Sequence, residues 1–335
     1  YASMACGNTN YGETKDYFVT ILPLVTNDAG IAGILSPTVP TCKFDSVDVT
    51  VALNNWGSDT LTFCDVKYTI NGGTATTYSY TGSVPPFGSG FDTVTIAIED
   101  FNTGDLLKVW TENPNGAQDS IDINDADSLM TVAGLSGIYT INNSQATAGT
   151  NYQTFSDATD DLVQYGVCDD VVFNVASNTY SIVVSLIDII GTSEDATITF
   201  QSATGNWNDV IITSGSTGPI NLSGADWVTF KDIKLENSSG NCVYFGGSSD
   251  HITFDHCWMK GGFSTSNPSY TLINMQSPAS YFTLVNNKLE KGSSWIYSQS
   301  GSTSSYKMDW VIEDNNMKDQ SYGYGYIFYV DGMEM

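Results

Sequence analysis

The side chains of this sequence that could carry acid–base chemistry lie in its second half. The best acidic group there consists of Asp232, Asp250, Asp255 and His256. A glycoside hydrolase needs two carboxyl groups at a defined separation on one face. Asp255 and His256 are adjacent, so on an extended strand they point to opposite faces, which weakens them as a pair. We therefore expect no enzyme, and hydrolysis through these four residues is the alternative.

A polysaccharide lyase would instead need a strong base and cationic groups that stabilise a carboxylate-derived anion. All eleven cationic side chains are lysine, and the formal net charge is −26. Such a chain repels phosphate backbones and anionic lipid, so nucleic acid is excluded as a partner and cations are the natural counterpart. Solubility and self-repulsion are the alternative explanation of the acidity.

An acidic segment, Asn113 to Ser128, offers oxygen ligands at near-alternating spacing. The candidate ligands are Asp119, Asp122, Asn124, Asp125 and Asp127. Carboxylate and amide oxygens at such spacing can wrap a Ca²⁺ ion. The segment lacks the glycine and terminal glutamate of an EF-hand loop, so a solvated acidic linker is the alternative. Ca²⁺ is the one cofactor we consider, because neither a P-loop nor a dinucleotide fingerprint is present.

The six cysteines indicate an oxidising compartment, since none of them has the spacing of a zinc site. Connectivity does not follow from sequence, and Cys42 with Cys64 is the pairing that we would test first. The longest apolar run, Tyr17 to Val25, is far too short to cross a bilayer. We expect an extracellular chain with no membrane-spanning segment.

Short β-branched and aromatic runs separated by Gly, Asn, Ser and Pro predict an all-β protein. The strands expected in the first third are 17–24, 47–53, 61–70, 76–80, 93–98 and 106–111. Asn71-Gly72-Gly73 predicts a hairpin turn. This number of alternating strands is typical of a β-sandwich. We place a tail or linking strand at residues 1–24, the sandwich at 25–126 and a parallel β-helix at 127–335.

A repeat is the basis for the β-helix. Its copies begin at Ile198, Val228, Ile252, Phe282 and Trp310, which are 24 to 30 residues apart, close to one turn of a three-sided β-helix. A polar bend position within the repeat is occupied by Asp232, His256, Asn286 and Asp314. We expect these four side chains to form a ladder along the coils. An amphipathic helix between Gln153 and Tyr165 is expected to cap the open end.

Three stretches resemble modules of secreted Bacteroidota proteins. Tyr11-Gly12-Glu13-Thr14-Lys15-Asp16-Tyr17 resembles the end of a GEVED-type domain, although Lys15 replaces the usual acidic residue. Asn55-Trp56-Gly57 and Tyr68-Thr69-Ile70-Asn71-Gly72-Gly73 are similar to CARDB-like, immunoglobulin-type domains. Tyr139-Thr140-Ile141-Asn142 and Val171-Val172-Phe173-Asn174-Val175 resemble the entry to a right-handed β-helix of the pectin-lyase-like superfamily.

The resemblance implies export by the type IX secretion system, whose C-terminal sorting domain is missing, so we expect a fragment with a truncated β-helix. It also implies O-glycosylation at Asp-Ser/Thr followed by an aliphatic residue. The candidate positions are Ser46, Thr60, Thr93, Ser120 and Ser128. Many members of the pectin-lyase-like superfamily cleave acidic polysaccharides, which is the source of the enzyme alternative.

Together these features predict an immunoglobulin-like β-sandwich followed by a right-handed parallel β-helix with a short N-terminal capping helix. We expect a structural or adhesive module of a cell-surface protein, and a fibre or filament subunit is the assembly considered. Its partners would be neighbouring copies, other surface proteins or glycans. The abundant tyrosines and tryptophans keep a carbohydrate-binding or polysaccharide-cleaving protein open as the alternative.

Overall fold

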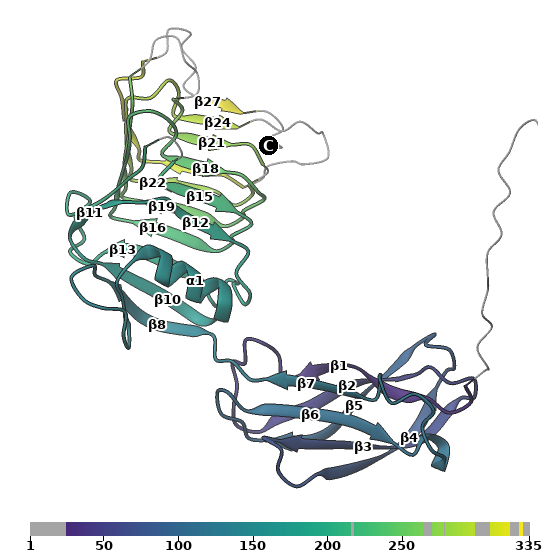
Figure 1. The fold of residues 1–335 in the computed structure, drawn as a ribbon. Coiled ribbons are helices and arrows are strands. Elements are labelled where there is room, and N and C mark those ends of the chain that lie inside the picture. The colour runs from purple at the N-terminus through teal and green to yellow at the C-terminus, as the bar shows by residue number, and fades with distance from the viewer. Residues whose placement is uncertain are drawn as a thin grey trace, which may run out of the picture. The chain divides into compact units, whose positions relative to one another are not determined.

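The computed structural model describes residues 25–215, 218–263, 270–277, 279–298 and 309–321, and the backbone of 328–330 (Figure 1). The described chain is mostly β-strand with one α-helix. It divides into two compact units. The first contains the described residues up to Leu35, Val49–Ala97 and Leu107–Leu129, and the second contains Ser36–Asp48, Ile98–Leu106 and the chain from Met130 onward. The sequence-based boundaries at 24/25 and 126/127 stay a prediction.

The strands before residue 131 form two sheets. One sheet has the order β1-β2-β5, formed by Ala29–Ser36, Val47–Asn55 and Phe91–Glu99. The other has the order β4-β3-β6-β7, formed by Thr76–Val84, Leu61–Ile70, Leu106–Glu112 and Ala126–Met130. Side chains alternate between buried and exposed, as at Val49, Val51 and Leu53, because a strand places alternate residues on opposite faces. The short 3₁₀ helix η1 is Pro114–Gly116.

The strand predictions for this part are confirmed wherever the structure describes the chain. β3 and β4 pair antiparallel across the predicted turn, where Asn71 and Gly72 have φ of 53° and 68°. Positive φ at both central residues is what a tight hairpin turn requires. The predicted strand 17–24 lies outside the described residues. β1 and β7 were not predicted, since β1 is glycine-rich and β7 lies in the acidic segment.

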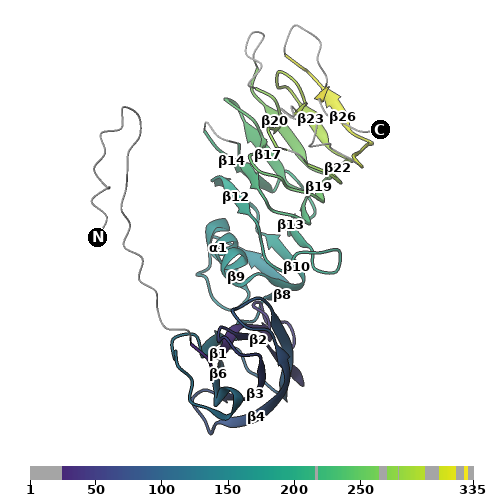
Figure 2. The same ribbon diagram turned by 90° about the vertical axis from the view of Figure 1, so that its right-hand side faces the viewer.

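From residue 135 the chain winds through three parallel sheets in turn, which is the course of a parallel β-helix (Figures 1 and 2). The first coil sheet contains β8 Leu135–Ile141, β9 Asn151–Tyr152, β10 Val167–Val175, β13 Ile198–Ser202, β16 Val228–Lys231, β19 Ile252–Asp255, β22 Thr283–Val285 and β25 Val311–Glu313. The second contains β11 Asn178–Ser181, β14 Val210–Thr213, β17 Lys234–Asn237, β20 Trp258–Gly261, β23 Lys288–Glu290 and β26 Asn316–Lys318. The third contains β12 Val184–Ile187, β15 Ile220–Ser223, β18 Val243–Phe245, β21 Ile273–Met275, β24 Ile296–Ser298 and β27 Phe328–Val330.

The strand register agrees with the sequence repeat. Ile198 pairs with Val228, and Val228 pairs with Ile252, so three predicted copies begin at equivalent positions. The third residue of each of the first three copies, Phe200, Phe230 and Phe254, is buried in the core, where these rings form a column with Phe173 of β10. Successive rings in this column have centroids 4.8, 5.5 and 5.2 Å apart and nearly parallel planes. Burial of these large apolar rings stabilises the coils.

The predicted helix is present as α1, Phe155–Tyr165. Thr154 caps its N-terminus, because its side chain accepts a hydrogen bond from the Asp157 amide while the Asp157 carboxylate accepts one from the Thr154 amide. Phe155, Ala158 and Leu162 are buried in the same core as the coil strands. The Phe155 ring lies 5.2 Å from that of Tyr180 and 6.0 Å from that of Phe200, so the helix packs against the core of the first coils.

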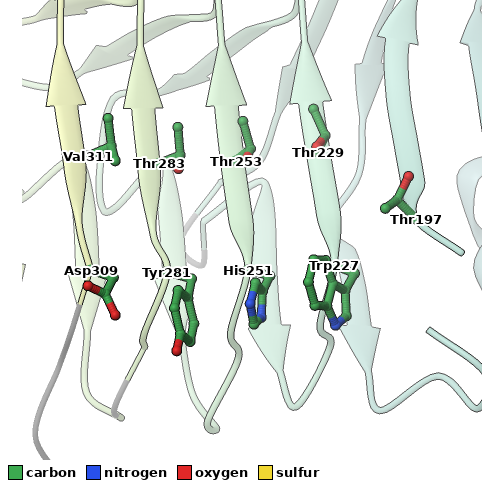
Figure 3. A pocket seen from close by; sticks show the side chains of 9 residues that line it. All are labelled: Thr197, Trp227, Thr229, His251, Thr253, Tyr281, Thr283, Asp309 and Val311. Carbon is green, nitrogen blue, oxygen red and sulfur yellow. The ribbon is translucent and has the colours of Figure 1, made fainter. Parts of the chain in front are cut away.

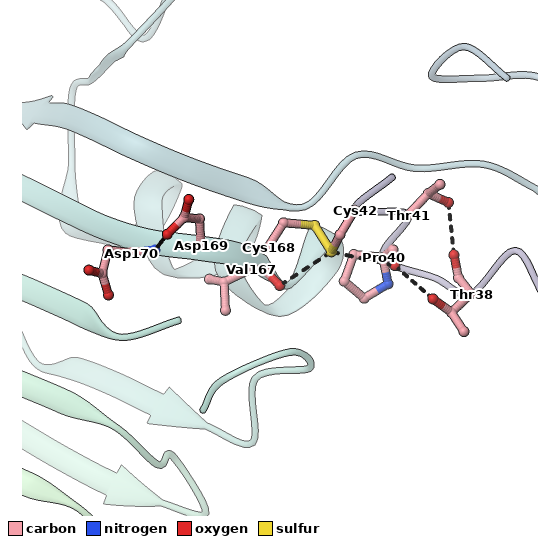
Figure 4. Close-up of a disulfide and its surroundings, with 8 residues drawn as sticks. All are labelled: Thr38, Pro40, Thr41, Cys42, Val167, Cys168, Asp169 and Asp170. Carbon is pink, nitrogen blue, oxygen red and sulfur yellow. Dashed lines mark hydrogen bonds between the residues drawn. A yellow bond between two sulfur atoms is a disulfide. The ribbon is translucent and has the colours of Figure 1, made fainter. Parts of the chain in front are cut away.

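The predicted Cys42–Cys64 disulfide is wrong. Cys42 is bonded instead to Cys168 of β10, with the Cα atoms 5.2 Å apart (Figure 4). Cys64 is fully buried in β3 with a free thiol, and burial raises its pKa to about 12. Its side chain is one of the alternating inward residues of that strand, so it is committed to the core. Segment 36–48, which carries Cys42, clusters with the coils. In the part of the chain that the structure describes, no helix is long and apolar enough to cross a membrane.

Candidate functional site

A groove of about 450 Å³ lies on the outer face of the first coil sheet (Figure 3). Two rows of side chains line it, because residues two apart on a strand point to the same face. The lining residues are Thr197, Trp227, Thr229, His251, Thr253, Tyr281, Thr283, Asp309 and Val311. They come from successive coils and are 24 to 30 residues apart in the sequence, so the groove exists only because the coils are in register.

Three rings form one side of the groove. The centroids of Trp227 and His251 are 3.6 Å apart, and those of His251 and Tyr281 are 4.2 Å apart, with planes within 10° and 11° of parallel. Figure 3 shows the three side chains side by side in coil order, with Thr197 beyond Trp227 and Asp309 beyond Tyr281. The inner faces of the stack are therefore covered by neighbouring rings.

These rings stand at a strained backbone position. Trp227, His251, Tyr281 and Asp309 have φ of 59°, 56°, 54° and 57°. A left-handed conformation costs an L-residue roughly 1–2 kcal/mol, and aspartate tolerates it better than a bulky aromatic residue does. Ring stacking, at roughly 0.5–1.5 kcal/mol per pair, offsets part of this cost. The backbone position itself therefore does not require aromatic residues.

The predicted ladder residues lie at the opposite end of the same strands, where the chain turns from the first to the second coil sheet. Asp232, His256, Asn286 and Asp314 all have positive φ, between 50° and 58°. The Asp232 Oδ1 atom shares a hydrogen bond with His256 Nδ1 one coil later. The His256 ring also stacks on that of Trp207 at 4.4 Å. Asn286 donates its amide to Asp255 rather than to His256.

The structure does not bring the four candidate catalytic residues together. Asp232, Asp255 and His256 are at the turn between the first and second coil sheets, whereas Asp250 precedes β19 at the turn from the third sheet. The Asp250 Oδ1 atom accepts a hydrogen bond of 2.6 Å from the Ser280 amide. The Asp250 carboxylate therefore binds a backbone amide at a different corner of the coil.

Asp255 is poorly suited to act as a general acid. Burial by itself raises the pKa of Asp255, but hydrogen bonds from Asn286 and Lys231 outweigh it, so the pKa lies below the ordinary value. The Lys231 ammonium lies 3.1 Å from the Asp255 carboxylate. A general acid near neutral pH needs a raised pKa. This carboxylate is instead held in its charged form by an ion pair.

An inward-facing asparagine ladder follows the bend and was missed in the sequence. Asn287 is 1% exposed and accepts a hydrogen bond of 2.7 Å from the Cys257 amide through its Oδ1 atom. The Asn315 Oδ1 atom accepts one of 2.8 Å from the Asn287 amide in the same way. Repeated Asn at 286–287 and 315–316 was the available signal. Each amide satisfies buried backbone groups of neighbouring coils.

Charged side chains on the second coil sheet also interact across coils. Glu236 accepts from Lys234 at 2.7 Å and from Lys260 at 2.8 Å. The Trp258 ring lies between two ammonium groups, with Lys288 at 3.5 Å and Lys234 at 4.3 Å from its centroid. Both cation–π contacts follow from strand register, since these residues are 24 and 30 positions apart. Sequence reasoning did not identify this cluster.

The candidate calcium ligands do not form a preformed site. Asp119, Asp122 and Asp125 line one hollow of about 300 Å³. Among the described residues, however, no three acidic, histidine or cysteine side chains are grouped closely enough to hold an ion. Asp119 accepts hydrogen bonds from the amides of Ala29 and Ile121.

The other candidate ligands have separate roles. Asp127 accepts from the amide of Ile34, and the Asn124 amide donates to Asp28. Burial, followed by repulsion from Asp119, Asp122 and Asp28, raises the pKa of Asp125 to about 6. Ca²⁺ binding therefore stays a prediction without an assembled ligand set.

All five candidate glycosylation positions are exposed: Ser46, Thr60, Thr93, Ser120 and Ser128. Accessibility is a requirement for modification, and whether modification occurs stays a prediction. Comparisons with protein families, curated proteins and solved structures found no significant match to this chain.

Proposed function

We propose that this chain is an extracellular structural or adhesive module of a cell-surface protein, whose coils hold a fixed shape rather than perform catalysis. The observation that carries the proposal is the use of outward side chains in contacts between coils. Trp227, His251 and Tyr281 stack across three coils. On the second coil sheet, Glu236 of β17 pairs with Lys260 of β20, one coil later, as well as with Lys234 of its own strand.

These contacts favour rigidity over reactivity. Individual exposed ion pairs contribute little to stability, typically 0–1 kcal/mol. Repeated at successive coils, they fix the register of the strands along with the aromatic and asparagine ladders. Carboxylates that a catalyst would need are already paired, as Asp255 is with Lys231. Such coils are better suited to a stiff spacer, or to a surface that binds a partner, than to catalysis.

The disulfide supports the extracellular part of the proposal. Disulfides persist in oxidising compartments and are rare in the cytosol. Cys42–Cys168 closes a separation of 126 residues, which makes it an effective covalent constraint on the unfolded chain. The exposed positions Ser46 and Thr60 are consistent with a glycosylated surface protein.

The proposal includes the finer fold assignment. The sheets of three and four strands fit an immunoglobulin-type β-sandwich of the CARDB-like kind. The three parallel sheets fit a right-handed β-helix of the pectin-lyase-like superfamily. Both fits agree with the resemblance to secreted Bacteroidota proteins.

The assembly part is tested on the purified chain by light scattering over a wide concentration range, together with negative-stain electron microscopy. We expect concentration-dependent oligomers or filaments. A monomer at every concentration, without filaments, would rule out self-assembly by this chain and leave only a spacer or adhesive role.

A second candidate function is carbohydrate binding or cleavage, favoured by the groove on the first coil sheet. Incubation with neutral and acidic polysaccharides separates the two forms of this candidate. New reducing ends or unsaturated products would show an enzyme, and their loss in Asp255→Ala would locate the chemistry at the bend. Retention without cleavage would show a binding module.

A further inference from the structure

We propose that the groove lined by Trp227, Tyr281 and the threonine row binds an uncharged glycan chain. This inference rests on the adhesive part of the proposed function and names its contact surface. The groove is open to solvent along several coils and has a volume of about 450 Å³, enough for a few sugar rings. Figure 3 shows the aromatic row and the threonine row running parallel along the stack of strands.

The two ends of the ring stack offer apolar faces. Beyond the stack lie Thr197, one coil before Trp227, and Asp309, one coil after Tyr281 (Figure 3). Neither short side chain can cover a ring as another ring does. Tyr281 is 44% exposed. Sugar rings present flat C–H faces that pack on such aromatic faces, while the adjacent Asp309 carboxylate is in position to accept hydrogen bonds from sugar hydroxyls. The Thr197 hydroxyl donates to Asp170 at 2.6 Å, so it offers a sugar hydroxyl only its acceptor side.

The aromatic residues are not explained by the turn alone. Asp309 occupies the same position as Trp227 and Tyr281 with the same left-handed backbone, at φ of 57°. Bulky residues at such positions carry a strain of order 1 kcal/mol, and strained residues are enriched at binding sites. Stacking offsets this strain within the row, but the choice of aromatic residues at both of its ends agrees with a ligand that uses the free faces.

The bottom of the groove provides repeated hydroxyl groups. Thr229, Thr253 and Thr283 are register partners on successive strands. Their side-chain hydroxyls make no hydrogen bond to other residues in the part of the chain that the structure describes. Strand neighbours are about 4.8 Å apart, and each hydroxyl can both donate and accept. A polymer with hydroxyl groups at regular intervals, lying along the coils, would satisfy this row.

Charge selects against an acidic polymer. The groove lining contains no lysine, and Asp309 adds a negative charge at one end. The whole chain has a formal charge of −26. A uronate or sulfated glycan would be repelled, whereas uncharged hydroxyl groups can donate to Asp309. The ligand class is therefore a neutral polysaccharide.

The test uses affinity electrophoresis and calorimetric titration of the full chain with soluble β-glucan, galactomannan and dextran, and with polygalacturonate and alginate as acidic probes. We expect at least one neutral polymer to bind and neither acidic polymer to do so. Tyr281→Ala combined with Trp227→Ala should raise Kd at least tenfold, which is about 1.4 kcal/mol.

Trp207→Ala is the matched control, since Trp207 also stacks on a histidine, His256, but at the opposite corner of the coils. Its Kd should not change. Thr253→Val is a nearly isosteric second variant that removes one groove hydroxyl without removing a ring, and it should weaken binding even if the aromatic variants misfold. Circular dichroism checks the fold of each variant.

Failure to bind any neutral polymer, preference for the acidic polymers, or equal loss in Trp207→Ala would overturn the inference. Self-assembly is measured separately by light scattering and microscopy. A chain that assembles without binding neutral glycan would therefore refute the groove assignment and leave the structural role standing.

Discussion

Removing the Cys42–Cys168 disulfide should destabilise the protein by about 5 kcal/mol at 25 °C. The bond joins residues 126 positions apart. In the chain-entropy description, closing a loop of this length removes conformational entropy from the unfolded state and raises its free energy by about 5 kcal/mol. If the strands between residues 49 and 129 stay folded while the coils unfold, the flexible part of the loop is shorter, and the expected effect falls to about 4 kcal/mol.

The assay compares urea unfolding of the oxidised chain with that of Cys42→Ser combined with Cys168→Ser. Circular dichroism follows the strands, and each transition is fitted separately because the chain has two compact units. Adding reductant should lower the urea midpoint of the oxidised chain and leave that of the double variant unchanged. Peptide mapping without reductant should find Cys42 linked to Cys168. Linkage of Cys42 to Cys64, or an unchanged midpoint after complete reduction, would refute the reasoning.

Three further predictions concern the core, the helix cap and a half-buried carboxylate. Phe230→Ala should lower the free energy of urea unfolding by about 3–5 kcal/mol, because the fully buried Phe230 ring lies between those of Phe200 and Phe254. Phe263→Ala is the control: the Phe263 side chain is 69% exposed, so its removal should leave the free energy of unfolding almost unchanged. Thr154→Ala should lower stability by about 1 kcal/mol through loss of the cap of α1, and Thr154→Ser should retain most of it; equal loss in both would contradict a capping role. Asp125→Asn should stabilise the chain at pH 7.5 by about 1–2 kcal/mol, after allowance for partial exposure, and should have no effect near pH 3.5. The pKa of Asp125 in the folded state is about 6, above the ordinary 3.8. The wild-type chain therefore loses stability as pH rises from 3.8 to 6. Thermal melts at the two pH values check this, and a variant that is less stable at pH 7.5 would show that the carboxylate is needed in its charged form.

The local patterns in the sequence were sufficient for the helix, the repeat and the strands that alternate apolar and polar residues. Alternation of apolar and polar residues identifies a half-buried strand wherever it occurs, as at Val47–Asn55. The copies beginning at Ile198, Val228 and Ile252 showed the coil register directly, since a parallel solenoid places equivalent positions beside one another. The glycine-rich β1 has no such pattern, and its formation depends on pairing with β2.

The acid–base candidates show where sequence proximity misleads. Asp232 and His256 are 24 residues apart and share a hydrogen bond, whereas Asp250, only six residues before His256, lies at another corner of the coil. In a β-helix, each corner redirects the chain, so distance along the sequence does not measure distance in space. The Lys234, Trp258 and Lys288 contact is a second example of neighbours that only the register defines.

The sequence by itself thus determined the all-β class of this protein, its parallel coils and the position of the helix. The tertiary structure decided the partner of Cys42, the stacking of Trp227 on His251 and the groove beside them. The physical reason is that secondary structure follows from periodicities of two or a few residues, which a sequence displays. A disulfide or a groove depends on which distant segments meet, and that is fixed by the packing of the whole chain.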